Sequence, residues 1–281
     1  MSSNRTILVT GATGQQGGSL IRALAGSDFV LRAMTRKPDS EKAARLRAAG
    51  VEVLQGDLDD PASLKKALAG AWGVFAVQNT LEAGVEKEEE QGKRIAELAK
   101  QAGVQHYVYT SVGSAHRNTG IPHFDNKWRV EGTVRGLHFP SHVIMRPVFF
   151  MENLLSPGFL NGDTMYSSLD EGTSLQMIAV EDIGRCIAPA FTDAARFNGR
   201  EIDLAGDAAT MPEAAAALSA GLGRSINYVR IPIEEVRKHS EDIAIMLEWF
   251  DRVGYNADIP GLEREFGFKP TTLADWAKRQ R

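Results

Sequence analysis

Three glycines near the N-terminus have the spacing of a phosphate-binding turn. They follow the apolar run Thr6–Thr10 and lead into a helical pattern over Gly17–Ala25. A glycine lets the backbone approach a pyrophosphate closely, because no Cβ stands in the way. The start of the following helix offers unpaired N–H groups and its positive dipole end to phosphate oxygens. This order predicts a dinucleotide-binding turn, with a glycine-rich turn without a ligand as the alternative. The turn consists of Gly11, Ala12, Thr13, Gly14, Gln15, Gln16 and Gly17.

A basic pair follows the second apolar run. Arg36 and Lys37 come directly after Val30–Thr35. Sites that are specific for NAD usually carry an acidic residue here, which accepts a hydrogen bond from the ribose 2′-OH. A guanidinium instead binds the 2′-phosphate of NADP through paired, charge-assisted hydrogen bonds. The pair therefore predicts NADP(H) as the cofactor, and a surface Arg–Lys pair is the alternative.

Polar residues also follow the third and fourth apolar runs. Asp57 can accept a hydrogen bond from the adenine amino group while Leu58 packs on the ring, or Asp57 is an ordinary turn residue. The sequence leaves these two interpretations open. Gln78, Asn79 and Thr80 follow the fourth run, where we expect the central phosphates and the ribose.

Two titratable residues stand at the head of a later helical pattern. His123 follows Pro122, and Lys127 comes four residues later. A spacing of four places both side chains on one helix face. The fifth apolar run ends before Ser111, and the sixth leads into Pro147.

The elements that must position these residues alternate regularly. Strands are predicted at Thr6–Thr10, Val30–Thr35, Val51–Gln55, Val74–Gln78, Tyr107–Thr110 and Val143–Met145. Helices are predicted at Gly17–Ala25, Glu41–Ala49, Ala62–Ala69, Glu86–Gln101 and Phe124–Arg135. This alternation predicts an α/β fold, a Rossmann-type doubly wound parallel sheet. Such sheets bind ligands at the carboxyl ends of their strands, which is where the polar residues lie. The charged run Glu86–Glu90 is interpreted as a solvated helix face.

The regular alternation of strands and helices ends after Pro147, and we expect a smaller α+β C-terminal lobe there. Residues 156–176 read as loops with short strands. Further elements are predicted at Ile183–Phe191, Glu201–Leu204, Pro212–Ala220, Asn227–Arg230, Glu234–Arg252 and Leu273–Lys278. The predicted division is an NADP-binding domain over residues 1–150 and a substrate or partner lobe over 151–281, interleaved with the first.

Composition excludes several classes of function. The 281-residue chain has a formal net charge of −4, unlike a protein that binds nucleic acid directly. No apolar stretch is long enough to span a bilayer, and the first strand begins too early for a signal peptide. The single cysteine, Cys186, reads as a buried structural thiol and fits a reducing compartment, so we expect a cytoplasmic protein. The histidines are scattered and no Cys-x-x-Cys or Gly-x-Ser-x-Gly motif occurs, so neither a metal site nor a hydrolase is predicted.

Taken together, the motifs resemble the short-chain dehydrogenase/reductase superfamily. They are most similar to its atypical NmrA-like branch, including redox-sensor proteins of the HSCARG type. The resemblance covers nearly the whole chain, and the His-Phe-Asp-x-Lys element is its most specific part. It rests on Gly11–Gly18, Thr35-Arg36, Gln55–Asp57, Gln91–Lys93, His123–Lys127, Phe150–Leu155, Ser168–Gly172 and Val180–Gly184. It implies that Lys127 contacts the nicotinamide ribose and that Pro147, Phe149, Phe150 and Asn153 lie near the nicotinamide.

One position departs from the classical members, which place a tyrosine four residues before the lysine. Here that position holds His123, whose imidazole has a reference pKa of about 6.5 against about 10 for a phenol. The departure puts classical carbonyl reduction in doubt. The first hypothesis is therefore an NADP(H)-binding redox-sensing regulator that acts through a protein partner.

The alternative is an NADPH-dependent reductase of a quinone, an enone or another small carbonyl compound. His123 or Lys127 would then deliver the proton. A third interpretation gives His123 only a packing role at the helix start and Lys127 only the ribose hydroxyls. Whether the protein turns over a substrate is left open, and a homodimer is the assembly to be tested.

Overall fold

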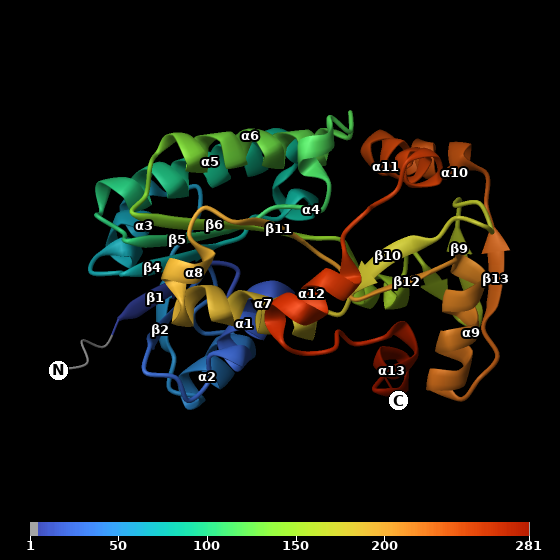
Figure 1. The fold of residues 1–281 in the computed structure, drawn as a ribbon, viewed down its shortest axis with the longest axis horizontal. Coiled ribbons are helices and arrows are strands. Elements are labelled where there is room, and N and C mark those ends of the chain that lie inside the picture. Colours follow the sequence, from blue (N-terminus) through green and yellow to red (C-terminus); the bar gives the residue numbers. More distant parts are fainter. Residues whose placement is uncertain (1–4, 281) are drawn as a thin grey trace. The chain divides into compact units, whose positions relative to one another are not determined.

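The computed structural model describes residues 5–280, which form two compact units (Figure 1). Unit 1 contains the described part of Met1–Ser111 together with Asn126–Met145 and Ile183–Ile202. Unit 2 contains Val112–Asp125, Arg146–Asp182 and the described part of Asp203–Arg281. The chain thus passes between the units several times, and the sequence-based division near residue 150 stays a prediction.

A seven-stranded sheet forms the centre of the first unit. Its strands are β1 (Thr6–Val9), β2 (Val30–Thr35), β3 (Glu52–Gln55), β4 (Gly73–Ala76), β5 (His106–Thr110), β6 (Ser141–Pro147) and β11 (Glu201–Leu204). They lie in the order β11-β6-β5-β4-β1-β2-β3. The pairs from β1 to β6 are parallel, and the order reverses beside β1. The predicted doubly wound parallel sheet is confirmed, with its switch point directly beside the glycine turn.

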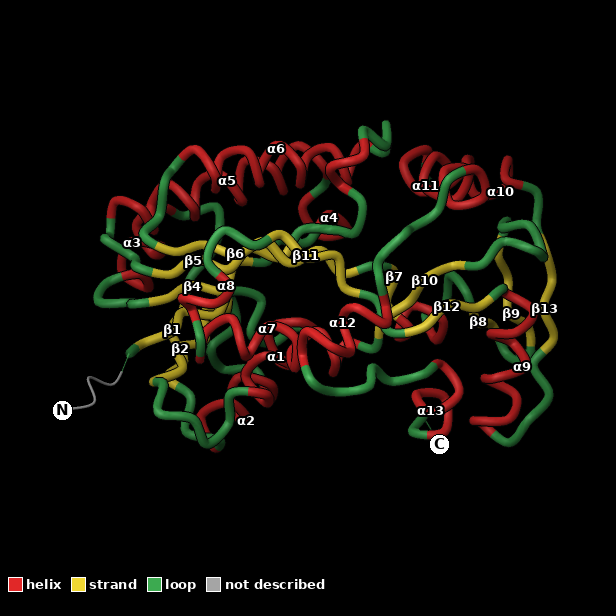
Figure 2. Tube along the Cα trace, viewed as in Figure 1, coloured by secondary structure: helices red, strands yellow, loops and turns green. Residues whose placement is uncertain are grey.

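Helices cover both faces of this sheet (Figure 2). On one face lie α3 (Pro61–Leu68), α5 (Val85–Gln101) and α6 (Pro122–Gly136), and on the other lie α1 (Gln15–Ala23), α2 (Glu41–Ala48) and α7 (Val180–Thr192). Local capping explains where two of them begin. The side chain of Ser40 accepts from the N–H of Ala43 at α2, and Asp60 caps α3 with Pro61 as its first residue.

Unit 2 is built on two small sheets. One contains β7 (Phe149–Phe150), β10 (Leu175–Ile178) and β12 (Asp207–Ala209), and the other contains β8 (Leu160–Asn161), β9 (Thr164–Ser167) and β13 (Asn227–Arg230). The remaining helices of the unit are α9 (Met211–Leu222), α10 (Ile233–His239), α11 (Glu241–Arg252), α12 (Ile259–Phe266) and α13 (Leu273–Lys278). The apolar faces of α9, α10, α11 and α13 meet in one core, which also contains Met165 of β9.

Three sequence expectations differ from the structure. Glu201–Leu204 was assigned to the C-terminal lobe, but it forms β11 at the edge of the large sheet, beside β6. The helix predicted over Glu234–Arg252 is two helices, because Ser240 has an extended backbone and caps α11. The four-residue helices α4 (Thr80–Ala83) and α8 (Ala194–Phe197) were not predicted, since so few residues show little periodicity, and α12 was also missed.

None of the helices within residues 5–280 combines the length and the apolar character needed to cross a bilayer.

Candidate functional site

The glycine turn folds back on itself between β1 and α1. The N–H of Gly14 donates to the carbonyl of Gly11 at 2.9 Å, and Gly11 has a φ of +56°. A Cβ on Gly17 would lie 2.5 Å from that same carbonyl oxygen, and a Cβ on Gly11 would lie 2.6 Å from Val77 Cγ1. The glycines are therefore required to close the turn. Because Gly14 provides no side-chain cap, the first N–H groups of α1 stay open to an acceptor.

A glutamine of the turn connects it to the next part of the sheet. Thr110, at the end of β5, donates a hydrogen bond to Oε1 of Gln16 at 2.7 Å. Ala12 is buried, whereas Gln15 is exposed. The turn is therefore anchored by its glycine packing and by Gln16, and Gln15 is its solvent-facing side chain.

The basic residues after β2 are exposed, and one of them already has an acidic partner. Arg36 forms an ion pair with Glu82 of α4, and the two side chains are 61% and 56% exposed. Lys37 is also exposed. A phosphate that binds the guanidinium must therefore compete with the Glu82 carboxylate.

The residues after β3 make hydrogen bonds and apolar contacts within unit 1. Oδ1 of Asp57 accepts a hydrogen bond from the N–H of Asp59 at 3.0 Å, and Leu58 packs against the core of unit 1. These contacts support a turn role for Asp57. An adenine contact for Asp57 and Leu58 stays a prediction.

The polar residues after β4 have different roles. Asn79 caps α4 by accepting from the N–H of Leu81, and Thr80 donates to Glu88. Gln78 is 7% exposed, and neither its amide nitrogen nor its amide oxygen has a hydrogen-bond partner among residues 5–280. Gln78 is therefore the predicted residue of this group whose polar atoms remain open to a ligand.

Other buried polar atoms of unit 1 are open in the same way, on Ser111 and Asn126 among others. Within the described chain, Oγ of Ser111 and Oδ1 of Asn126 have no hydrogen-bond partner. Buried polar atoms left without a partner cost about 1–3 kcal/mol each, so they indicate a bound molecule or water. The open amide of Gln78 and the Cβ-free turn both fit a dinucleotide.

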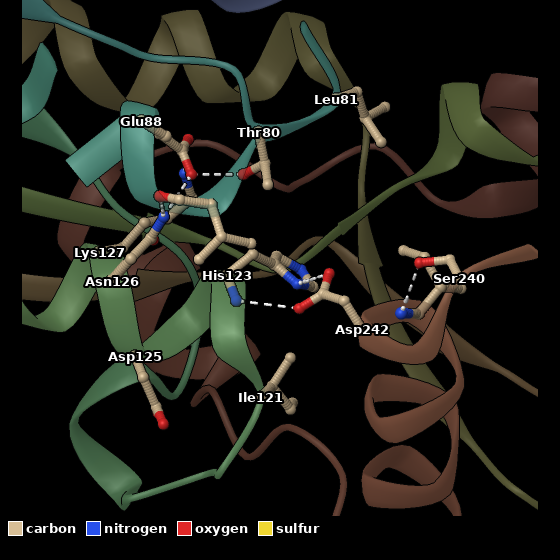
Figure 3. Close-up of polar contacts among 12 residues, drawn as sticks. Thr80, Leu81, Glu88, Ile121, His123, Asp125, Asn126, Lys127, Ser240 and Asp242 are labelled. Carbon is tan, nitrogen blue, oxygen red and sulfur yellow. Dashed lines mark hydrogen bonds and ion pairs between the residues drawn. The ribbon is translucent and has the colours of Figure 1, made fainter. Parts of the chain in front are cut away.

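Lys127 lies in the second turn of α6 and is held by a buried acid (Figure 3). Its Nζ forms an ion pair with Glu88 of α5, and the side chains of the two residues are 13% and 1% exposed. Thr80 and Asn126 also donate to the Glu88 carboxylate. The carboxylate therefore has three donors, one from α4 and two from α6.

His123 lies in the first turn of α6 and also faces an acid (Figure 3). Its Nδ1 is 2.5 Å from Oδ2 of Asp242, in the first turn of α11, and its backbone N–H donates to Oδ1 at 3.0 Å. The ring contact is close but is not aligned as a hydrogen bond. The imidazole and the Phe124 ring are nearly perpendicular, with 4.8 Å between their centroids. Nδ1 thus faces a negative charge, so Nε2 is the nitrogen left for a reaction partner.

The residues that the resemblance implies near the nicotinamide belong to unit 2. Pro147 and Phe149 are buried, and the Phe149 ring packs on Phe159 with 5.3 Å between centroids. Phe150 and Asn153 are partly exposed. Whether these four residues contact a cofactor stays a prediction.

Glu152, between them, has a structural role that the sequence did not indicate. Both of its oxygens accept from the N–H of Val180 at 3.1 Å, and Oε1 accepts from Nε1 of Trp276 at 3.1 Å. Burial raises the pKa of the Glu152 carboxyl. The residue therefore ties the first turn of α7 to α13.

The sequence analysis missed Glu88 and Asp242. The interpretation of Glu86–Glu90 as a solvated face was wrong for Glu88, which shares the buried face of α5 with Gln91 and Ile95. The spacing of these three residues was a signal that could have shown it. Asp242 had no such signal, because it lies 119 residues from His123 in the chain.

Comparisons with known proteins agree with this architecture. A model described as the NmrA-like family matches residues 3–278. An NAD(P)H azoreductase from Xenophilus azovorans is 32% identical over 238 residues, which cover 83% of this chain and 79% of the relative.

Two solved structures have the same fold over almost the whole chain. An NADPH-dependent quinone oxidoreductase from Escherichia coli, complexed with NADPH, superimposes with a TM-score of 0.81 at 25% identity, covering 98% of this chain and 99% of that one. NmrA, a negative transcriptional regulator, in complex with NADP, gives 0.75 at 26% identity, covering 99% and 91%. On the extent of the family match, the chain belongs to the NmrA-like family.

Proposed function

We propose that the protein binds NADP(H) and uses NADPH to reduce a quinone, an enone or another small carbonyl compound. The observation that carries this proposal is the contact of 2.5 Å between His123 and Asp242. A carboxylate beside Nδ1 stabilises the protonated form of an imidazole, which is the form that can donate a proton. An imidazole that only packed at the start of a helix would not need an acid on its ring.

Residues of the large sheet support the cofactor part of the proposal. The glycine turn offers the N–H groups of α1 to the pyrophosphate, and Gln78 offers an open amide. Arg36 supplies the charge that a 2′-phosphate needs. The azoreductase is named for NAD(P)H, and the quinone oxidoreductase structure holds NADPH, which supports a reduced nicotinamide dinucleotide as the cofactor.

Lys127, His123 and Asp242 have different roles in the proposed reaction. NADPH, when bound, supplies the hydride. Lys127 donates hydrogen bonds from its ammonium to the hydroxyls of the nicotinamide ribose and so orients that half of the cofactor. His123 gives a proton from Nε2 to the substrate oxygen, and Asp242 stabilises the charged ring before the transfer. The imidazole takes the place of the classical tyrosine as the proton donor.

The test follows NADPH absorbance while purified protein is mixed with a panel of quinones and enones. We expect turnover above background that falls by about 10²–10⁴ in His123→Ala, the usual contribution of a general acid. His239→Ala is the matched control, because His239 is exposed at the end of α10 and should leave turnover unchanged. If NADPH binds tightly but no compound is reduced, or if His123→Ala keeps full turnover, the reductase proposal is wrong.

A redox-sensing regulator is the second candidate, and the Arg36–Glu82 ion pair favours it. A ligand phosphate that displaces Glu82 from Arg36 would change the surface contacts of α4. A protein partner could bind the two forms of this surface with different affinities. The related NmrA structure is named a negative transcriptional regulator and holds NADP. Because NADP⁺ and NADPH carry the same 2′-phosphate, redox sensing itself must come from groups at the nicotinamide. Calorimetry with the two forms tests this candidate, since equal affinities would leave nothing to sense.

A further inference from the structure

Glu88 is the most deeply buried charged side chain that contacts a predicted site residue. It is 1% exposed, and its two oxygens contact three donors, which come from α4 and α6 (Figure 3). Lys127 Nζ contacts Oε1, while Thr80 Oγ1 and Asn126 Nδ2 contact Oε2, the latter at 2.9 Å. Asn126 Nδ2 also donates to the carbonyl of Val85 at 2.7 Å, which ties α6 to the start of α5.

Burying a carboxylate such as that of Glu88 costs free energy unless all of its lost hydrogen bonds to water are replaced. A buried carboxylate loses its hydration, and the loss is recovered only when charge and hydrogen bonds replace it. Here an ammonium, a hydroxyl and an amide replace it together. A lysine side chain is otherwise flexible, with a long stem and considerable rotamer entropy. The Glu88 carboxylate therefore holds the Lys127 ammonium in one place.

The ammonium keeps capacity for a ligand while it is held. It has three N–H donors, and Glu88 is its one hydrogen-bond partner among the described residues. Two donors remain, which matches the two hydroxyls of a ribose.

We infer that Glu88 is a positioning residue for the cofactor, acting through Lys127. It does not touch the cofactor itself. It fixes the ammonium where the hydroxyls of the nicotinamide ribose arrive, and Thr80 and Asn126 hold the carboxylate in turn. The inference rests on the proposed binding of NADP(H), but it does not depend on turnover.

The test compares the affinities of two ligands that share the adenosine half with its 2′-phosphate. NADPH carries both ribose groups, whereas 2′,5′-ADP carries the adenine half and its 2′-phosphate but no nicotinamide ribose. In Glu88→Gln the charge that holds the ammonium is lost, so we expect about a tenfold weaker affinity for NADPH, the usual scale for a partner of a charged group. The affinity for 2′,5′-ADP should stay within about twofold. Calorimetry measures both affinities, and a thermal melt reports the stability of each variant.

Glu89→Gln is the matched control. Glu89 is the next residue of α5 and pairs with Lys93 and Arg129 instead of Lys127. This variant should leave the ratio of the two affinities unchanged. Should Glu88→Gln fail to fold, Thr80→Val removes one donor to the same carboxylate at a partly exposed position and should show the same ligand-selective loss with a smaller size.

A double variant separates positioning from general damage. If Glu88 acts through Lys127, then Glu88→Gln added to Lys127→Met should weaken NADPH no further than Lys127→Met alone. Equal loss for NADPH and 2′,5′-ADP, or additive losses in the double variant, would overturn the inference and leave Glu88 with a structural role. If the unmodified protein binds neither ligand, the cofactor proposal itself fails, which is a distinct outcome.

Discussion

Asp242 holds His123 at two points, although 119 residues separate them in the chain. Oδ1 accepts the backbone N–H of His123 at 3.0 Å, and Oδ2 lies 2.5 Å from the ring Nδ1. One carboxylate therefore sets both the main chain at the first turn of α6 and the direction of the imidazole. The pair makes the proton-donor role of His123 testable without removing the histidine.

The variant Asp242→Asn keeps an oxygen for the backbone N–H but removes the negative charge beside the ring. We expect kcat for the best quinone or enone to fall about 10- to 100-fold, part of what a general acid contributes. The affinity for NADPH should stay within about twofold, because Asp242 is not assigned to the cofactor.

Steady-state kinetics and calorimetry check this expectation. Glu241→Gln is the neighbouring control, since Glu241 pairs with Arg237 and has no contact with His123. Unchanged kcat in Asp242→Asn would mean that the ring does not need the charge.

Replacement of Arg36 tests the cofactor preference. In Arg36→Ala the affinity for NADP⁺ should fall about 10- to 100-fold, the scale of a lost charge-assisted hydrogen bond, while the affinity for NAD⁺ changes little. Calorimetry with both dinucleotides measures the difference. An equal loss for NAD⁺ and NADP⁺ would refute the assignment of Arg36 to the 2′-phosphate.

The ion-pair partner of Arg36 gives a prediction of opposite sign. Glu82→Gln frees the guanidinium, so NADP⁺ should bind about two- to fivefold more tightly, the scale of an exposed ion pair. The affinity for NAD⁺ should change little, because NAD⁺ has no 2′-phosphate for Arg36 to bind. Glu41→Gln, which breaks the exposed Glu41–Arg45 pair, is the control. A gain that is the same for both dinucleotides would count against competition at Arg36.

His106 gives the protein a pH-dependent stability that is separate from its function. Burial of the ring between Trp72 and Phe191 lowers the pKa of His106 to about 4. The unfolded chain binds a proton near pH 6.5, so between pH 6.5 and 4 it binds more protons than the folded protein. The stabilisation is complete above about pH 6.5 and is lost as the pH falls, by about 2–3 kcal/mol between pH 7 and pH 4.5.

Denaturant unfolding at pH 7, 5.5 and 4.5 measures this effect. In His106→Phe, which keeps an aromatic ring in the stack, the fall in the free energy of unfolding should be smaller by that amount. A fall of the same size in both proteins would show that other groups cause it.

The regular part of the fold was predictable because its signals are local. Val30–Thr35 is observed as the strand that the sequence predicts, and α2 begins at Glu41 as its cap requires. The assignments of Glu88 and Ser240 were wrong for different reasons. A run of acidic residues looks solvated until a partner on another helix is known, and a single extended residue divides an otherwise continuous helical pattern.

The sequence by itself determined the parallel sheet, the turn that needs glycine and the basic residue that follows β2. These features depend on backbone sterics, periodicity and charge within short segments. Only the tertiary structure decided that Glu82 pairs with Arg36, that Glu88 holds Lys127 and that Asp242 faces His123. Each of these acids meets its cation or ring through the packing of separate elements, and ion pairs of this kind have no short-range pattern from which they could be read.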